Sequence, residues 1–267
     1  MEVIVESLLA GKIAPLGERQ APSGIDKKSV SGPVRLLYDG LECDEQGDKK
    51  VHGGPEKAVH HYPRDHYADW LNDVGENQQL NDAGAFGENI STTGLTEHNV
   101  AVGDRFRIGT AVIEVSQGRQ PCWKLNARFN VTDMAVRVQK TGRTGWYYRV
   151  LHEGVVAQDD VMTLIERLSP EWTLHRFWHL LYVDTLNYDE LAQMAKIDAR
   201  RQIAQPEAVR GDVQHRKVGI DAAHDAEARQ GIGAALQQLG RAVAVHMAHH
   251  HEDLPHACDE VHRAADG

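Results

Sequence analysis

Short runs of apolar and β-branched residues, separated by Gly, Asp and Asn, dominate residues 1–168. Several runs alternate apolar and polar residues, and others are apolar throughout, which is typical of strands in a barrel or sandwich. We therefore expect strands within residues 3–11, 33–44, 57–63, 104–109, 110–117 and 160–168. Gly109 and Thr110 join two of these runs in the manner of a hairpin turn.

Two stretches with helical spacing interrupt the strand pattern. Residues 63–74 place their apolar positions on one helical face, and residues 131–142 offer Thr132 as an N-cap and Gly142 as a C-terminal stop. The segment that follows Cys122 also looks helical. These patterns predict a mainly β (α+β) fold, in which a mostly antiparallel β domain carries a few peripheral helices.

The residue pattern and composition of the chain change twice after this domain. Residues 173–181 and 187–195 have helical spacing, with Asp and Glu at 189–190 suited to a first turn. None of the 16 Phe, Trp and Tyr residues lies in 198–267, although half of the 16 His residues do. We therefore divide the chain into a β domain at 1–168, a helical appendage at 169–197 and a His/Ala-rich tail at 198–267. We expect this tail to be partly disordered, and its composition resembles translation in a shifted frame.

Charge and composition exclude several classes of function. The net charge of −10 argues against a general nucleic-acid binder, whose surface would be basic. The sequence has no apolar run long enough to span a bilayer and no secretory signal pattern, so we expect no membrane partner. Three cysteines do not make a disulfide framework, which favours a reducing, cytoplasmic setting.

Cys122 directly follows Pro121 and lies between Arg119 and Lys124 in the segment SQGRQPCWKLN. Neighbouring cations and a helix N-terminus stabilise a thiolate, which is both a nucleophile and a soft metal ligand. The alternative is a small core residue, because free cysteine is often buried. Since Pro121 breaks the preceding strand, the local sequence leaves both interpretations open and favours a loop.

A second candidate region lies just upstream of the strand at 57–63. Gly53 and Gly54 after His52 allow a tight turn and close approach of the backbone to a ligand. Lys49 and Lys50 precede them, so a phosphate could be held by amides and ammonium groups.

Two other groups of polar residues stand out. His60, His61 and His66 suggest a metal cluster, but neighbouring residues on a strand point to opposite faces, so satisfied or solvated histidines are the simpler interpretation. The loop containing Asn89, Ser91, Thr92 and Thr93 could satisfy a polar heterocycle, although this stretch alone favours an ordinary turn.

Four segments together resemble the MOSC family, and most closely its YiiM-type subgroup, which is associated with resistance to N-hydroxylated purines such as 6-N-hydroxylaminopurine. They read GLECDEQGDKKVHGGPEKAVHHYPRDHY, FGENISTTGLTEHNVAVGD, VSQGRQPCWKLN and KTGRTGWYYRV. They fall in the family's order, and the helical piece after 170 resembles the start of the subgroup's three-helix appendage. The resemblance implies a β-barrel-like domain with peripheral helices.

The resemblance also implies a cofactor and a reaction. The cofactor is the molybdenum cofactor, a phosphate-bearing pterin, with Cys122 as the catalytic residue and thiolate ligand to molybdenum. The reaction is the reduction of N-hydroxylated bases or amines, a detoxification that needs a separate flavin or iron–sulfur electron donor, because this chain has too few cysteines for a cluster of its own. The residues implied to bind the cofactor are Lys49, Lys50, His52, Gly53, Gly54, Asn89, Ser91, Thr92, Arg119, Lys124 and Asn126.

Cys43 departs from the family pattern, which has a glycine at this position. If the position required φ > 0, the cysteine would cost about 1 kcal/mol or more in strain.

Two further interpretations stay open: a sulfur carrier that holds a persulfide on Cys122, and a cofactor-binding or storage protein without turnover. The sequence also leaves a homodimer open.

Overall fold

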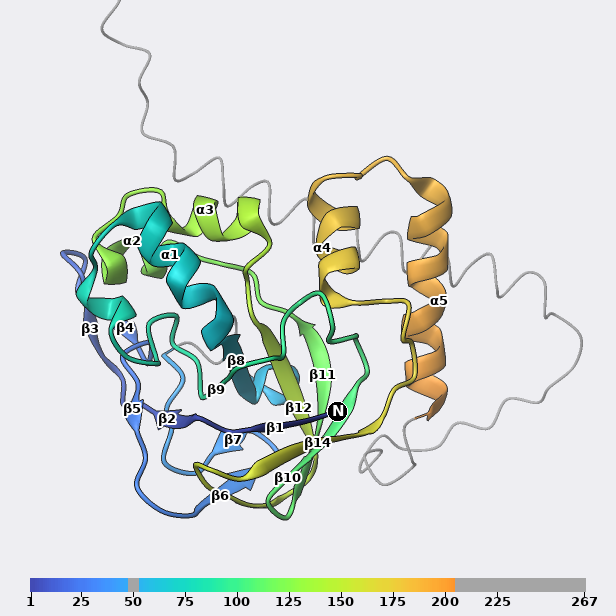
Figure 1. The fold of residues 1–267 in the computed structure, drawn as a ribbon, viewed down its shortest axis with the longest axis horizontal. Coiled ribbons are helices and arrows are strands. Elements are labelled where there is room, and N and C mark those ends of the chain that lie inside the picture. The colour runs from blue at the N-terminus through green and yellow to red at the C-terminus, as the bar shows by residue number, and fades with distance from the viewer. Residues whose placement is uncertain (48–52, 205–267) are drawn as a thin grey trace, which may run out of the picture. The chain divides into compact units, whose positions relative to one another are not determined.

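The computed structural model describes residues 1–47 and 53–204, with side chains up to Ile197. The chain forms two compact units, of which the first spans Met1–Asn187 and the second begins at Tyr188. Figure 1 shows the strands of the first unit, with α1, α2 and α3 gathered near one end of them. The partial disorder predicted for 198–267 falls mostly on residues outside the described part.

Nine strands of the described residues form one sheet, in the order β1-β14-β10-β11-β12-β8-β9-β2-β5. All neighbours pair antiparallel except β8 and β9, which pair parallel, so the predicted mainly antiparallel β domain is confirmed. The strands are β1 (Glu2–Ile4), β2 (Ser7–Ala10), β5 (Lys28–Ser29), β8 (Val59–Pro63), β9 (Ile90–Thr92), β10 (Arg105–Ile108), β11 (Ala111–Gly118), β12 (Trp146–His152) and β14 (Val161–Glu166).

Two smaller sheets complete the strand layer. A three-stranded sheet pairs β13 (Gly154–Val156) with β6 (Val34–Leu37), and β6 with β7 (Gly40–Leu41). A separate hairpin is formed by β3 (Ala14–Leu16) and β4 (Ala21–Ser23). The apolar run at 33–44 is therefore a pair of short strands with a turn.

The N-terminal run, expected as one strand, is split into two. β1 and β2 belong to opposite ends of the sheet order and are separated only by Val5 and Glu6. The Val5 amide donates to the Asp160 carbonyl at 3.0 Å, and the Glu6 amide donates to the Ser91 carbonyl at 3.0 Å. These two residues carry the chain from the partner strand β14 to the partner strand β9, which accounts for the break.

The local pattern located one hairpin correctly and missed two strands inside the sheet, β9 and β12. Ile108 pairs with Ala111 across Gly109 and Thr110, as the turn signal predicts. β12 was not among the expected strands, yet it lies between β11 and β8 in the sheet. Its Trp146, Tyr148 and Val150 are buried in alternation with less buried neighbours, so a period-2 pattern was present in WYYRVLH.

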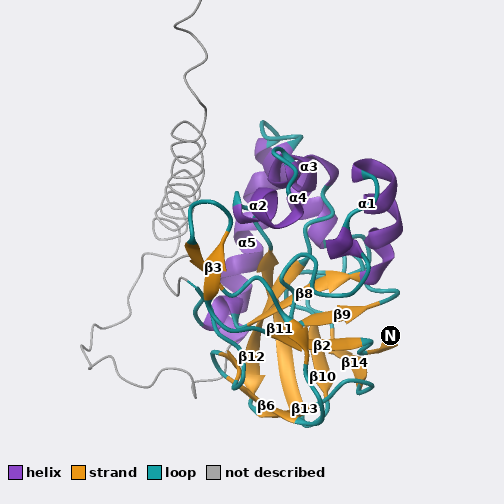
Figure 2. Ribbon diagram, turned by 90° about the vertical axis from the view of Figure 1, so that its left-hand side faces the viewer, coloured by secondary structure: helices purple, strands orange, loops and turns teal. Residues whose placement is uncertain are grey.

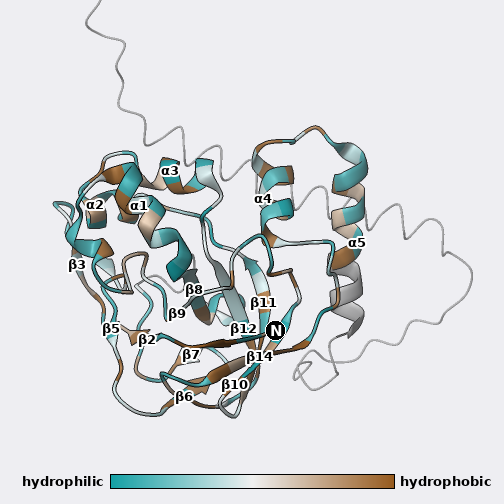
Figure 3. Ribbon diagram, viewed as in Figure 1, coloured by the Kyte–Doolittle hydropathy of each residue, from teal (hydrophilic) through white to brown (hydrophobic). Residues whose placement is uncertain are grey.

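Two buried apolar clusters hold the first unit together. The larger cluster lies on the strands and includes Phe106, Ile113, Trp146 and Tyr148. The smaller one is largely aromatic and packs α1, α2 and α3 against β8. Figure 2 shows these helices on one side of the strands, and Figure 3 shows apolar residues concentrated on strands such as β1 and β14.

The three helices of this smaller cluster follow the expected pattern closely. They are α1 (Tyr67–Val74), α2 (Lys124–Phe129) and α3 (Met134–Thr141). Gly142 ends α3 with φ of 71°, as predicted. The predicted Thr132 N-cap is wrong, because a turn from Val131 to Met134 delays the helix by one residue and places Asp133 at the N-cap. Three short 3₁₀ turns complete the unit: η1 (Pro55–Lys57), η2 (Arg64–His66) and η3 (Gln78–Leu80).

The predicted C-terminal helices are α4 (Leu174–Tyr182) and α5 (Tyr188–Ala204). Thr173 caps α4 by accepting a hydrogen bond from the Arg176 amide at 3.2 Å. Within the first unit, the Trp178 indole donates to the Gln139 carbonyl at 2.7 Å, which fixes α4 on the β domain. Among the described residues, no helix combines the length and apolarity that a membrane crossing requires.

His61 makes the stability of this fold sensitive to acid. Its side chain is fully buried, and its two ring nitrogens lie 3.0 Å from the Tyr148 and Thr92 hydroxyls. Burial lowers the pKa of His61 to about 3. Because the unfolded chain takes up a proton near pH 6.5 and the folded chain does not, stability falls as the pH drops below that value.

We expect this histidine alone to remove about 1.4 kcal/mol of stability at pH 5.5 relative to pH 7.5. Urea unfolding at the two pH values measures the loss. His61→Asn should reduce the pH dependence by roughly that amount, whereas His152→Asn, at an exposed position, should leave it unchanged. Equal pH dependence in the wild type and His61→Asn would contradict this account.

Candidate functional site

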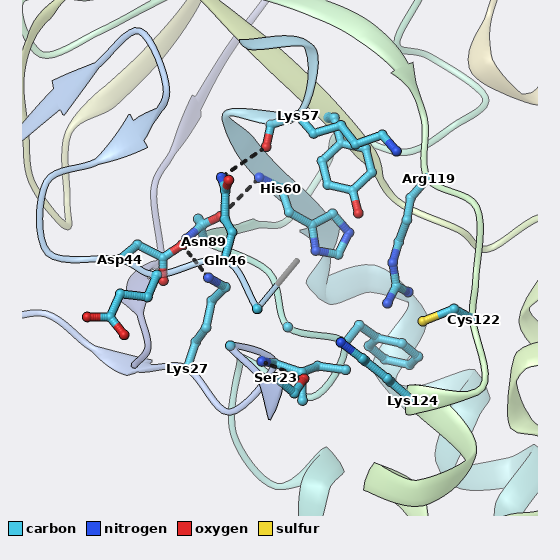
Figure 4. A pocket seen from close by; sticks show the side chains of 17 residues that line it. Ser23, Lys27, Asp44, Gln46, Lys57, His60, Asn89, Arg119, Cys122 and Lys124 are labelled. Carbon is cyan, nitrogen blue, oxygen red and sulfur yellow. Dashed lines mark hydrogen bonds and ion pairs between the residues drawn. The ribbon is translucent and has the colours of Figure 1, made fainter. Parts of the chain in front are cut away.

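A cleft with an empty volume of about 590 Å³, including its mouth, lies beside the ends of β8, β11 and β12 (Figure 4). Loops far apart in the sequence supply most of its walls: the segments at 23–27, 44–47, 86–89 and 119–124. The lining residues are Ser23, Gly24, Ile25, Lys27, Asp44, Glu45, Gln46, Gly47, Lys57, His60, Phe86, Gly87, Asn89, Arg119, Cys122, Lys124 and Tyr147.

Cys122 is presented to this cleft by the connection between β11 and α2. The Arg119 amide donates to the Gly145 carbonyl at 3.0 Å, which fixes the chain just after β11 ends. The Leu125 amide donates to the Cys122 carbonyl at 3.0 Å as α2 begins. Cys122 is half-buried and makes no disulfide, and Figure 4 shows its sulfur pointing into the cleft. The interpretation as a sealed core residue is therefore wrong.

Basic side chains line the cleft beside the thiol (Figure 4). The Arg119 side chain is only 7% exposed and is directed toward the cleft on the same wall as Cys122 (Figure 4). One guanidinium nitrogen, Nη1, is buried without a hydrogen-bond partner in the described part of the chain. The Lys124 ammonium donates to the Pro22 carbonyl at 3.0 Å, and the Lys57 ammonium lies 5.9 Å from the centre of the Tyr147 ring. This wall favours an anionic ligand.

The opposite wall carries a buried ion pair between Lys27 and Asp44, whose side chains are 7% and 5% exposed. The Asp44 carboxylate also accepts hydrogen bonds from the Gly11 amide at 2.7 Å and the Asn89 side-chain amide at 2.9 Å. Burial lowers the pKa of Lys27 below its ordinary value, while the Asp44 carboxylate opposes that shift. The pair holds a fixed positive group against the cleft.

His60 contributes an unsatisfied polar atom. Its Nε2 is buried and has no hydrogen-bond partner among the described residues, and its ring lies 5.1 Å from that of Tyr147. Burial, and then the charge of Arg119, hold the pKa of His60 well below its ordinary value, so the ring is neutral at pH 7. A buried nitrogen without a partner is costly unless a ligand or water satisfies it.

The structure brings four of the predicted site residues to the cleft: Asn89, Arg119, Cys122 and Lys124. Asn89 acts mainly as scaffold, because its carbonyl oxygen accepts from the His60 amide while its amide nitrogen donates to the Leu9 carbonyl and to Asp44.

The glycine-rich segment upstream of β8 is only partly described. Gly53 and Gly54 do not line the cleft, and Lys49, Lys50 and His52 lie outside the described residues.

Three predicted contacts are corrected. Ser91 and Thr92 are fully buried on β9, where the Ser91 hydroxyl donates to the Tyr62 carbonyl and the Thr92 hydroxyl meets His61. The Asn126 side chain accepts from the Ala135 amide at 2.8 Å and so helps to fix the start of α3. None of these three lines the cleft, because each side chain is committed within the protein.

Sequence reasoning did not single out Lys27, Asp44, Lys57 or Tyr147 as site residues. Lys27 and Asp44 lie in separate loops that only the folded chain brings together. Tyr147 pairs directly with His60 across β12 and β8. Recognising β12 as a strand beside β8 would therefore have placed Tyr147 next to His60.

Two other sequence hypotheses can be placed on the structure. The three histidines considered as a metal cluster are separated: His60 faces the cleft, His61 lies in the core, and His66 contacts Glu97 at 2.7 Å. Cys43 is half-buried against the larger apolar cluster and does not have positive φ, so the strain considered for this position is absent.

Comparisons with known proteins place these features in a family context. The MOSC domain family matches residues 48–163, and the YiiM-like, 3-alpha helix domain family matches residues 172–199. Protein YiiM of Escherichia coli strain K12 is 50% identical over 159 residues, which cover 60% of this chain and 70% of that protein.

Two further similarities extend this picture. The crystal structure of YiiM from Geobacillus stearothermophilus is 33% identical, with a TM-score of 0.61 over 72% of this chain and 90% of that one. A protein of Gibberella moniliformis named reductase is 38% identical over 176 residues, which cover 66% of this chain but only 31% of that protein.

Proposed function

Because the chain belongs to the MOSC domain family, in its YiiM-like branch, we propose that it binds the molybdenum cofactor in this cleft and reduces N-hydroxylated bases or amines. The MOSC family is associated with binding of that cofactor. The reductase name of the fungal relative supports the reaction class. The observation that carries the proposal is a free thiol, Cys122, directed into a cleft whose adjoining wall is cationic.

The residues of the cleft fit a metal-bearing, phosphorylated pterin. Thiolate sulfur is a suitable ligand for a soft transition metal, and Cys122 provides it. Arg119 and Lys124 provide positive charge for a phosphate, and Nη1 of Arg119 is a donor that has no hydrogen-bond partner within the described residues. The bare Nε2 of His60 and the hydroxyl of Ser23 can serve a polar heterocycle.

When bound, the cofactor supplies a metal that takes up and releases two electrons. The chain's own side chains then bind, orient and shield the reactants. Arg119 and Lys124 would hold the anionic end and Cys122 would hold the metal, while Phe86 and Ile25 line the cleft with apolar groups. A separate flavin or iron–sulfur protein would deliver the electrons.

The test uses protein purified from cells that make the cofactor. We expect near-stoichiometric molybdenum and pterin, and reduction of an N-hydroxylated purine when an artificial electron donor is supplied. Cyanide-labile sulfur on Cys122 without metal would contradict the proposal and indicate a sulfur carrier. Bound cofactor without turnover, with several donors and substrates, would leave a binding protein.

A further inference from the structure

The proposed reaction consumes protons as well as electrons, so the cleft needs an acid. We infer that Lys27 is the catalytic acid that protonates the oxygen leaving an N-hydroxylated substrate. This inference rests on the proposed function and adds a named proton donor to it.

The position of Lys27 suits this role. Its side chain lies on the wall of the cleft opposite the wall that carries Cys122 (Figure 4), so a ligand in the cleft lies between the thiol and the ammonium. Lys27, Ser23 and Ile25 also line a second hollow, with an empty volume of about 1540 Å³ including open solvent. Lys27 therefore borders both hollows.

The surroundings of Lys27 have opposing effects on the pKa of its ammonium. Asp44 pairs with the ammonium and is itself fixed by the Gly11 amide and Asn89. Glu88 and Cys43 also favour the charged form, while the removal of Lys27 from water has the larger, opposite effect and lowers its pKa. The Lys27 charge in turn helps to lower the pKa of the neighbouring His60 ring. A lysine ammonium with a lowered pKa is a better acid near neutral pH than an exposed one.

The other proton-bearing groups of the cleft suit the role less well. His60 is neutral at pH 7, because its pKa is held well below the ordinary value. Burial raises the pKa of Tyr147, and a guanidinium such as that of Arg119 does not give up its proton. The Lys124 ammonium donates to the Pro22 carbonyl. Burial lowers the pKa of Lys57 as well, but its ammonium lies near Tyr147 and Arg119 and not on the wall opposite Cys122 (Figure 4).

The step balances as R–NH–OH + 2 e⁻ + 2 H⁺ → R–NH₂ + H₂O. The N–O bond breaks and its electron pair leaves with the oxygen, which takes one proton from Lys27 Nζ and departs as water. The two electrons that the nitrogen gains would be supplied by the separate flavin or iron–sulfur protein, with the cofactor as the group that passes them on. The nitrogen takes the second proton from solvent. Lys27, left as a neutral amine beside Asp44, regains its proton from solvent.

The first experiment compares Lys27→Arg with the wild type, both loaded with cofactor. Arginine keeps the positive charge beside Asp44 but cannot donate its proton, so we expect kcat to fall by about 10²–10⁴ while molybdenum and pterin contents stay unchanged. Lys28→Arg is the matched control, since the Lys28 side chain is 78% exposed and pairs with Asp26 at the surface. We expect its kcat to match that of the wild type.

A second measurement does not depend on activity. In protein labelled with ¹³C-lysine, the Lys27 Cε resonance, identified by its absence in Lys27→Arg, should titrate at lower pH than those of the exposed lysines. Asp44→Asn removes the anion that stabilises the ammonium. The titration of Lys27 and the decrease of kcat at high pH should therefore both move to lower pH.

The outcomes separate the two proposals. An active wild type with an equally active Lys27→Arg, or a Lys27→Arg that loses cofactor instead of rate, overturns the assignment of Lys27 alone. The same conclusion follows if Lys27 titrates with the exposed lysines. A wild type that takes up no molybdenum and reduces no N-hydroxylated compound overturns the proposed function and the acid together.

Discussion

Replacing Cys122 with serine is expected to lower the rate of reduction, per bound molybdenum, by more than about a hundredfold. Loss of a residue that merely orients a metal ligand costs about 10–100-fold, and loss of the ligand should cost at least as much. Serine keeps the shape of the site but presents a hard oxygen in place of a soft sulfur. Since Arg119 and Lys124 remain, we expect most of the pterin to be retained.

Cys43→Ser provides the matched control, because Cys43 is also a free, half-buried cysteine but does not line the cleft. Initial rates with an N-hydroxylated purine, normalised to molybdenum measured on the same samples, give the comparison. We expect Cys43→Ser to keep most of the wild-type rate, because Cys43 has the smallest of the charge effects that act on Lys27. A Cys122→Ser protein that retains more than a tenth of the normalised rate would remove the thiol from the reaction.

The second large effect concerns the aromatic cluster that supports the cleft. Phe86 is fully buried, stacks on Tyr62 with ring centres 3.9 Å apart and packs 5.0 Å from the Phe129 ring, yet it also lines the cleft. Phe86→Ala should lower the free energy of unfolding by about 3–5 kcal/mol, because it removes buried area and leaves a cavity among rigid rings.

Urea unfolding of the cofactor-free protein measures this loss without interference from ligand binding. Val136→Ala on α3 is the control, since Val136 is 42% exposed and its truncation should change stability by about 0.5 kcal/mol or less. If Phe86→Ala cost no more than Val136→Ala, the aromatic cluster would not support the cleft in the way its packing indicates.

Features set by neighbouring residues could be predicted from the sequence. Gly109 and Thr110 indicated the β10–β11 hairpin, Gly142 indicated the end of α3, and Pro121 placed Cys122 in a loop. In each case one or two residues fix the local backbone, through a preferred turn, a positive φ or a missing amide hydrogen.

Features that depend on long-range pairing could not be predicted in this way. Ser91 and Thr92 were expected to be ligands because their segment is polar, but β9 pairs with both β8 and β2, and all three of its residues are buried. Lys27 and Asp44 meet only because Asp44 bonds back to Gly11 and Asn89. No periodicity in either loop encodes that contact.

X-ray absorption at the molybdenum edge tests the central claim most directly, when wild-type and Cys122→Ser proteins purified with cofactor are compared. The account predicts that the metal in the serine variant has one sulfur neighbour fewer than in the wild type, with an oxygen in its place. Identical sulfur coordination in the two proteins would show that Cys122 does not bind the metal and would contradict the account.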